Sequence, residues 1–360
     1  MSEFKPGLEG VVAFETEIAE PDRDGGALRY RGVDIEELVG VVPFEKVWGL
    51  LVDDRPEPGL TPAEPYRADG LTGNAPADLQ AVTAHLGGEW GLGQLIDISD
   101  GQAEADLRRL SATMISVAAQ SARVADGNHV PVDPGVIAQG RTAAERFLLE
   151  WRGEADPKHV QAIDTYWICT AEHGLNASTF TARVVASTGA DCAACLSSAV
   201  GALSGPLHGG APARVLPMLD GAAAAGSVEG YVGNLLDSGE RLMGFGHRVY
   251  RAEDPRARLL RDTARKLGSP RFAVAEELER VALAELHRRK PDRVLATNVE
   301  FWSAVVLDVA DIPPRLAPAM FACSRTAGWS AHIMEQKRLG RLVRPAARYV
   351  GPGARPLASV

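Results

Sequence analysis

Three histidines stand in glycine-rich or polar segments whose residue types could do chemistry. His173 lies in EHGLNASTF, His208 in SGPLHGGAP and His247 in MGFGHRVYR. Glycine beside His208 and His247 lets the backbone approach a ligand closely and leaves N–H groups available. Each histidine alone is more typical of a turn than of a catalytic site, so the surrounding residues must decide.

Arginines gather around these histidines. Arg248, Arg251 and Arg256 follow in HRVYRAEDPR, and Arg325 and Arg344 lie in CSRTAGW and LVRPAARY. A run of arginines is more often a solvated face than a site. Arg325, however, lies between the apolar stretches LAPAMFACS and AGWSAHI. We expect it to be buried, where a guanidinium needs a carboxylate or phosphate partner.

A carboxylate, Glu300, interrupts the apolar stretch ATNVEFWSAVVL. On local sequence the position predicts a helix start, with Asn298 as N-cap and Glu300 in the first turn, where a negative charge suits the helix dipole. The alternative is that Glu300 is a general base. Both readings stay open at this point.

Bulk composition excludes several classes of protein. The chain has 360 residues, enough for two domains, and a net charge of −9, which disfavours nucleic acid as a partner. We find no basic and apolar export signal at the N-terminus and no apolar run long enough to span a membrane. Four cysteines then fit a reducing cytoplasm, and Cys192 and Cys195 fit buried structural thiols better than a zinc or redox site.

Periodicity predicts a mainly helical protein. Residues 11–18 and 27–35 bracket a turn-rich segment and indicate a short N-terminal β-hairpin. Residues 53–76 are a Pro/Gly-rich connector, and nearly all later segments have apolar residues three and four apart. Proline clusters suggest domain boundaries near GGAPARVLPMLDG and DIPPRLAP. Phosphate-loop and dinucleotide-loop signatures are missing, which disfavours a kinase or an NAD enzyme.

Six motifs occur in the order found in citrate synthases: HGLNAST, GPLHGGA, MGFGHRVYRAEDPRA, NVEFWSAVVL, SRTAGWSAHIMEQ and RPAARYVGP. The chain therefore resembles a citrate synthase of the shorter bacterial type over nearly its whole length. The resemblance implies an all-α homodimer with a large domain formed by 1–215 and 319–360 and a small domain, 216–318, that closes over the active site. It also implies condensation of acetyl-CoA with oxaloacetate to give citrate and CoA. The CoA thioester is then a co-substrate, and no metal or permanently bound cofactor is implied.

The resemblance also assigns roles to individual residues. His208 matches the histidine that hydrogen-bonds the thioester oxygen, His247 the histidine that protonates the oxaloacetate carbonyl, and Glu300 the catalytic carboxylate. The matched oxaloacetate ligands are His173, Arg256, Arg325 and Arg344, with Arg344 expected from the partner subunit. The matched CoA contacts are Arg241, Leu242, Met243, Gly244, Phe245 and Arg251.

General chemistry supports the same residue types. A methyl group next to a thioester is far less acidic than a carboxylic acid whose pKa is about 4.3. A carboxylate can deprotonate it only if a donor meets the developing enolate oxygen. Oxaloacetate carries two carboxylates, which planar arginine forks bind in pairs. Exclusion of water by an inserted domain would protect the acyl-CoA.

Glu300 departs from the family, which usually has Asp in the motif NVDF. The stem gains one methylene, roughly 1.5 Å of C–C bond, and a misplacement of about 1 Å can cost on the order of a hundredfold in rate. Three alternatives to an active citrate synthase follow: a 2-methylcitrate synthase that uses propionyl-CoA, a weakly active oxaloacetate-binding paralogue, and a metallohydrolase built on the histidines. The last is disfavoured because no H-E-x-x-H pair is present.

Overall fold

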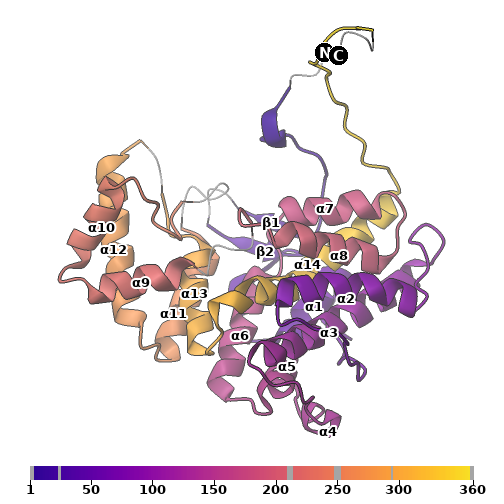
Figure 1. Ribbon diagram of the computed structural model, residues 1–360, viewed down its shortest axis with the longest axis horizontal. Helices are drawn as coiled ribbons and strands as arrows, with labels where there is room; N and C mark the ends of the chain where they lie inside the picture. The colour runs from indigo at the N-terminus through magenta and orange to yellow at the C-terminus, as the bar shows by residue number, and fades with distance from the viewer. Residues whose placement is uncertain (1–3, 23–25, 209–213, 247–252, 293–294, 357–360) are drawn as a thin grey trace.

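The computed structural model describes residues 4–22, 26–208, 214–246, 253–292 and 295–356, and the described part is mainly helical (Figure 1). The first eight helices are α1 (Phe44–Asp53), α2 (Ala75–Glu89), α3 (Asp100–Ala125), α4 (Pro134–Ile137), α5 (Ala143–Arg152), α6 (Pro157–Thr170), α7 (Ala177–Ala186) and α8 (Cys192–Leu203). The later ones are α9 (Val215–Ala224), α10 (Val228–Asp237), α11 (Pro255–Lys266), α12 (Phe272–Arg289), α13 (Val299–Val309) and α14 (Ala317–Leu339). The all-α prediction is confirmed.

A small antiparallel sheet lies near the N-terminus. It joins β1 (Ala19–Pro21), β2 (Leu28–Tyr30) and β3 (Val33–Asp34) in that order. The predicted hairpin therefore exists, but its first strand begins at Ala19, inside the segment that sequence assigned to the turn. Leu28 and Tyr30 are buried, and they pair with Pro21 and Ala19. Val11 and Val12, which sequence placed in the first strand, are exposed. The need to keep Leu28 and Tyr30 on the core face therefore explains the register of β1 with β2.

Two long buried helices, α6 and α14, form the centre of the molecule. The indole nitrogen of Trp167 donates to the Met320 carbonyl at 3.1 Å, and the Thr170 hydroxyl donates to Ser324 Oγ at 2.8 Å. Ser324 in turn donates to the Trp167 carbonyl at 2.7 Å. These bonds satisfy polar groups in the interior and fix the rotation of one helix against the other. The C-terminal end of α6 and the N-terminal third of α14 are thereby held side by side.

Helices α9 to α13 gather on one side of the molecule, and α11 and α13 pack against α6 (Figure 1). The beginning of α13, which carries Glu300, therefore faces the end of α6. None of the helices in the described ranges is long and apolar enough to cross a membrane.

Candidate active site

A cavity of about 180 Å³ opens where α6, α11, α13 and α14 meet. It brings together five residues that sequence selected from separate motifs: His173, His208, Arg256, Glu300 and Arg325. The other lining residues are Tyr166, Thr170, Asn298, Val299, Ser303 and Phe321.

Arg325 is a buried cation with spare hydrogen-bonding capacity. Its side chain projects from α14 and its residue is 3% exposed. Nε donates to the Thr170 carbonyl at 2.7 Å, while Nη1 has no hydrogen-bond partner among the described residues. Burial lowers the pKa of Arg325 below its usual range, although Glu172 opposes that shift. An unpaired donor on a buried guanidinium favours an anionic ligand in the cavity.

Arg256 is held by a carboxylate two residues earlier. Asp254 accepts from Nε of Arg256 at 2.9 Å and from Nη2 at 2.8 Å. The same carboxylate caps α11 through the Arg256 backbone N–H and accepts from the backbone N–H of Val299 at 3.1 Å. Asp254 thereby ties the start of α11, and the arginine on it, to the start of α13.

His208 is held by a hydroxyl on α7. Its Nε2 lies 2.8 Å from Ser178 Oγ. That oxygen accepts from the indole nitrogen of Trp329 at 3.2 Å and lies 2.8 Å from the acceptor Oδ1 of Asn176. The imidazole lies against Phe321, with 6.1 Å between ring centroids. Burial, with a smaller contribution from the charge of Arg325, lowers the pKa of His208 to about 4. The ring is therefore neutral at physiological pH and can act as an uncharged hydrogen-bond donor.

Glu300 occupies the first turn of α13, and the predicted N-cap is confirmed. Asn298 Oδ1 accepts from the Glu300 backbone N–H at 3.0 Å. The Glu300 carboxylate makes no hydrogen bond to any residue that the structure describes. Burial raises the pKa of Glu300, and the charge of Arg256 only partly offsets this. A carboxylate that is poorly solvated and not hydrogen-bonded is a stronger base than an ordinary one.

The segment that sequence linked to CoA lies beside the start of α13. Phe245 forms an antiparallel bridge with Thr297, and Gly244 accepts from the Asn298 N–H at 2.9 Å. Gly244 has φ +86°, and a Cβ there would come within 2.6 Å of the Phe301 Cβ. Only glycine fits this position. Of the five selected residues in this segment, Leu242 and Gly244 are buried, Met243 and Phe245 half-buried, and Arg241 exposed.

Besides the segment 241–245, three selected residues remain: Arg344, His247 and Arg251. Arg344 lies in the exposed extension that follows α14, away from this chain's cavity. His247 and Arg251 fall outside the described residues. Within the described ranges, no group of three His, Cys, Asp or Glu side chains is arranged to hold a metal ion. Cys192 and Cys195 are buried free thiols.

The residues that orient the cavity side chains through hydrogen bonds were not predicted from sequence. Ser178 holds His208 and Asp254 holds Arg256, yet neither was selected. Both had a signal: Ser178 lies in the motif HGLNAST, and Asp254 is the acid directly before the proline that begins α11. Glu172, which is fully buried beside His173, was missed as well.

Comparisons with known proteins agree with this geometry. The family model described as citrate synthase, C-terminal domain, matches residues 7–346. A protein of Mycobacterium tuberculosis named "Putative citrate synthase 2" is 60% identical over 99% of this chain and 95% of its own length. The citrate synthase of Haloferax volcanii is 36% identical over 97% of this chain and 96% of its own length.

Solved structures point the same way. Citrate synthase from Thermoplasma acidophilum, in ternary complex with carboxymethyl-CoA and oxaloacetate, superposes with a TM-score of 0.85. It is 26% identical, and the match covers 100% of both chains. The chain belongs to the citrate synthase family, and it is an acyltransferase of that fold.

The contact between Ser178 and His208 yields a prediction. Ser178→Ala should lower kcat by about five- to tenfold, because one hydrogen bond of about 1 kcal/mol no longer orients the imidazole. The KM should change little, since Ser178 does not line the cavity. Steady-state kinetics measure both parameters. Thr181→Ala on the same helix is the matched control, because its hydroxyl bonds only the Ala177 carbonyl. An unchanged kcat in a folded Ser178→Ala enzyme would show that this bond does not position the ring.

Proposed function

We propose that the protein is a citrate synthase that condenses acetyl-CoA with oxaloacetate, releasing citrate and CoA, with Glu300 as the general base. The observation that carries this proposal is one cavity that holds three matched groups. They are a buried arginine with a free donor, a neutral histidine and a carboxylate without hydrogen bonds, namely Arg325, His208 and Glu300.

Oxaloacetate is the ligand that the positive groups fit. One carboxylate would lie on Nη1 of Arg325, and Arg256, already oriented by Asp254, would meet the substrate from the opposite helix. His173 and the partner's Arg344 complete the proposed set. Aligned arginine forks hold a planar dianion in one orientation, which presents its ketone carbon to the second substrate.

The proposed enolisation uses Glu300 and His208 together. Glu300 takes a proton from the thioester methyl group, and a ring N–H of His208 donates to the oxygen that becomes negative. The Ser178 hydroxyl has one hydrogen, for which Nε2 of His208 and Oδ1 of Asn176 compete. With that hydrogen directed to Nε2, the hydrogen of the neutral ring is on Nδ1, which is then the donor to the enolate. A pKa of about 4 keeps the His208 ring uncharged at physiological pH, so the ring meets the enolate as a neutral hydrogen-bond donor.

The new carbon–carbon bond forms when the enolate carbon attacks the ketone of oxaloacetate. His247 would protonate the resulting alkoxide, and water would then hydrolyse the citryl thioester to citrate and CoA. The segment 241–245 and Arg251 are proposed to contact CoA. The proximity of that segment to the start of α13 supports this, because the reacting carbon must lie next to Glu300.

The direct test of the proposal is thiol release, compared between acetyl-CoA and propionyl-CoA with oxaloacetate. We expect acetyl-CoA to have the higher kcat/KM. A preference for propionyl-CoA would instead identify a 2-methylcitrate synthase. Oxaloacetate binding without thiol release from either thioester would identify a binding paralogue and overturn the proposal.

Variants of Glu300 test the base within the same assay. Glu300→Gln keeps size and hydrogen bonding but removes the base, so kcat should fall by at least about a hundredfold while oxaloacetate still binds. In the parent enzyme, kcat/KM should fall on the acid side with an apparent pKa above that of an ordinary Glu, because the base must be ionised. Glu300→Asp should be slower if the backbone has adapted to the longer stem. Near-normal turnover of the Glu300→Gln variant would exclude Glu300 as the general base, and its role would then be that of a negative charge at the start of α13.

The exposed C-terminal extension supports the proposal of an active site shared between two subunits. Residues 340–356 form no helix or strand, and the extension exposes Leu342, Tyr349 and Val350 beside Arg344. Figure 1 shows both ends of the chain extending away from the helical body. An extended apolar arm suits contact with a second copy, and it supports the proposal of a homodimer in which Arg344 enters the partner's site.

Mixed dimers test this sharing. Arg344→Ala subunits combined with Glu300→Gln subunits should recover activity, because one of the two sites then contains both lesions and the other contains neither. The recovered rate should approach half of the parental rate per dimer. Homodimers of each variant are the controls. Absence of recovery in verified heterodimers would show that Arg344 acts within its own chain.

Closure of a small domain, residues 216–318, over the large one is the last part of the proposal. Arg256 belongs to the first and Arg325 to the second, so a dianion between them would draw the two together. Oxaloacetate should therefore reduce the radius of gyration in X-ray scattering and raise the affinity for acetyl-CoA. Equal acetyl-CoA affinity with and without oxaloacetate would exclude this order of binding.

A further inference from the structure

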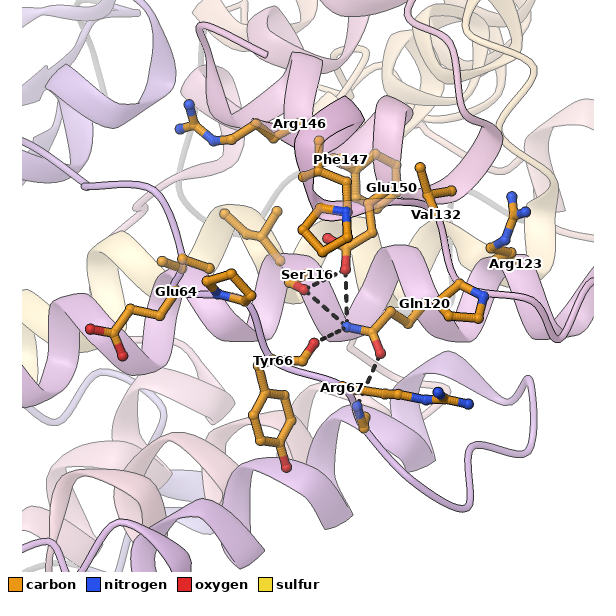
Figure 2. Close-up of a pocket in the computed structure, with 18 of the residues that line it drawn as sticks. Glu64, Tyr66, Arg67, Ser116, Gln120, Arg123, Val132, Arg146, Phe147 and Glu150 are labelled. Atoms are coloured by element: carbon orange, nitrogen blue, oxygen red, sulfur yellow. Dashed lines mark hydrogen bonds between the residues drawn. The ribbon is translucent and has the colours of Figure 1, made fainter. Parts of the chain in front are cut away.

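A second and larger cavity, of about 700 Å³, is shown in close-up in Figure 2. Helices α3 and α5 form its floor, and the segments 60–71 and 128–140 form its walls. It shares no lining residue with the active-site cavity. Sequence analysis assigned the first wall to a connector and gave the second no function.

Hydrogen bonds join both walls to the helices, so the shape of the cavity is fixed by specific contacts. Gln120 of α3 donates to the Tyr66 carbonyl at 2.8 Å and accepts from the Ala68 N–H at 3.0 Å. Arg123, also of α3, donates to the Val130 carbonyl at 2.6 Å and to the Trp151 carbonyl at 2.8 Å. The walls therefore stay apart at a fixed distance, as in a preformed ligand site.

The lining is mostly apolar, with a small number of polar groups directed inward. The apolar residues include Leu60, Leu71, Ala112, Ile115, Val132 and Phe147. A ligand with a hydrophobic body would bury apolar surface here, and each Å² buried would make the binding free energy more favourable by roughly 25 cal/mol. The polar groups must then select the ligand's head group.

Glu150 is the polar group with unused capacity in this apolar setting. Its Oε1 accepts from Ser116 Oγ at 2.7 Å and from Gln120 Nε2 at 3.0 Å (Figure 2). Its Oε2 makes no hydrogen bond and no ion pair with any residue that the structure describes. Burial raises the pKa of Glu150 to about 7, against the opposing effect of the two donors.

The other charged and titratable side chains that line the cavity leave Glu150 without a counter-charge. They are Glu64, Tyr66, Arg67 and Asp69 on one wall, Arg123 on α3, His129 on the other wall and Arg146 on α5. The Tyr66 hydroxyl donates to Glu89, and His129 is exposed. Arg123 is engaged by backbone carbonyls, Arg146 donates to the Gly140 carbonyl at 3.1 Å, and Glu64 pairs with Arg109. Arg67 and Asp69 are exposed at the rim. A half-buried carboxylate in an apolar cavity, with no cation paired to it among the described residues, favours a ligand that supplies one.

We propose that this cavity binds a small amphipathic amine, with the apolar part against α3 and α5 and the ammonium group on Oε2 of Glu150. An alcohol with the same apolar body would gain the burial but not the charge pair. A carboxylate would meet like charge at Glu150. The head group should therefore order the affinities as amine, alcohol, carboxylate.

Proton linkage gives a signature specific to Glu150. Near pH 6.5 the Glu150 carboxyl is largely protonated, and an ammonium ion favours the ionised form. Binding of the amine should then release a fraction of a proton. At pH 8.5 Glu150 is already ionised, so release should vanish and affinity should be higher.

The test is titration calorimetry of the intact protein with 2-phenylethylamine, 2-phenylethanol and 3-phenylpropanoate. At pH 8 the amine should bind at least about tenfold more tightly than the alcohol, because a charged hydrogen bond is lost with the alcohol. At pH 6.5, two buffers with different ionisation enthalpies should show proton release for the amine only. Glu150→Gln should lower amine affinity to that of the alcohol and abolish proton release.

Glu64→Gln is the matched control, because it removes the same charge from the rim of the same cavity and should leave amine affinity within about twofold. Three outcomes would overturn the proposal. They are equal affinity for amine and alcohol, an equal loss in Glu64→Gln and Glu150→Gln, and no heat from any probe up to its solubility.

Discussion

The buried guanidinium of Arg325 is the constraint around which the active site is arranged. Taking such a charge out of water is costly unless it is paired and hydrogen-bonded. The protein compensates with the Thr170 carbonyl and with the face of Phe321, 4.8 Å from the guanidinium carbon to the ring centroid. The fold leaves one donor open toward the cavity. The same charge adds to burial in keeping His208 neutral, so a single cation prepares both an anion site and an uncharged donor.

Behind Arg325, a buried chain of charges and hydrogen bonds explains why α14 tolerates so many polar residues in its interior. Arg183 donates to Nδ1 of His332 at 3.0 Å, so Nε2 of that ring carries the hydrogen that faces Glu172 at 3.2 Å. Burial acts to raise the pKa of Glu172, but His332 and Arg325 outweigh it and hold the pKa below its usual range. Gly328 is required beside it, since a Cβ there would lie 2.0 Å from Glu172 Oε2. Removing one member of this chain would leave a buried charge unpaired, which would lower the free energy of unfolding by about 3–5 kcal/mol.

Periodicity in the sequence predicted the helical class, and the resemblance to citrate synthases selected the five residues that converge on the cavity. For Glu300, the N-cap residue Asn298 also predicted the helix start that positions the carboxylate. The residues that hold the site were harder to find. Ser178 acts on His208, thirty residues away in the chain, and such a pair has no local period or spacing. The larger cavity was not predictable for the same reason, since its walls are irregular segments whose positions depend on long-range bonds from Gln120 and Arg123. The early strand was misplaced because burial of Leu28 and Tyr30, not local propensity, determines the register.

The close packing of Gly244 against Phe301 has a mechanical consequence. The backbone at 244–246 exchanges hydrogen bonds with 296–298, and Asp254 binds the next residue, Val299. With no space for even a methyl group between the segment and α13, neither can slide past the other. Any rotation of α11 and α13 must therefore move the carboxylate of Glu300, the segment 244–246 and Arg256 together as one rigid unit. The displacement has to be absorbed elsewhere, where the chain enters and leaves this group of helices, so the alignment of Glu300 with Arg256 and with the segment 244–246 survives the motion.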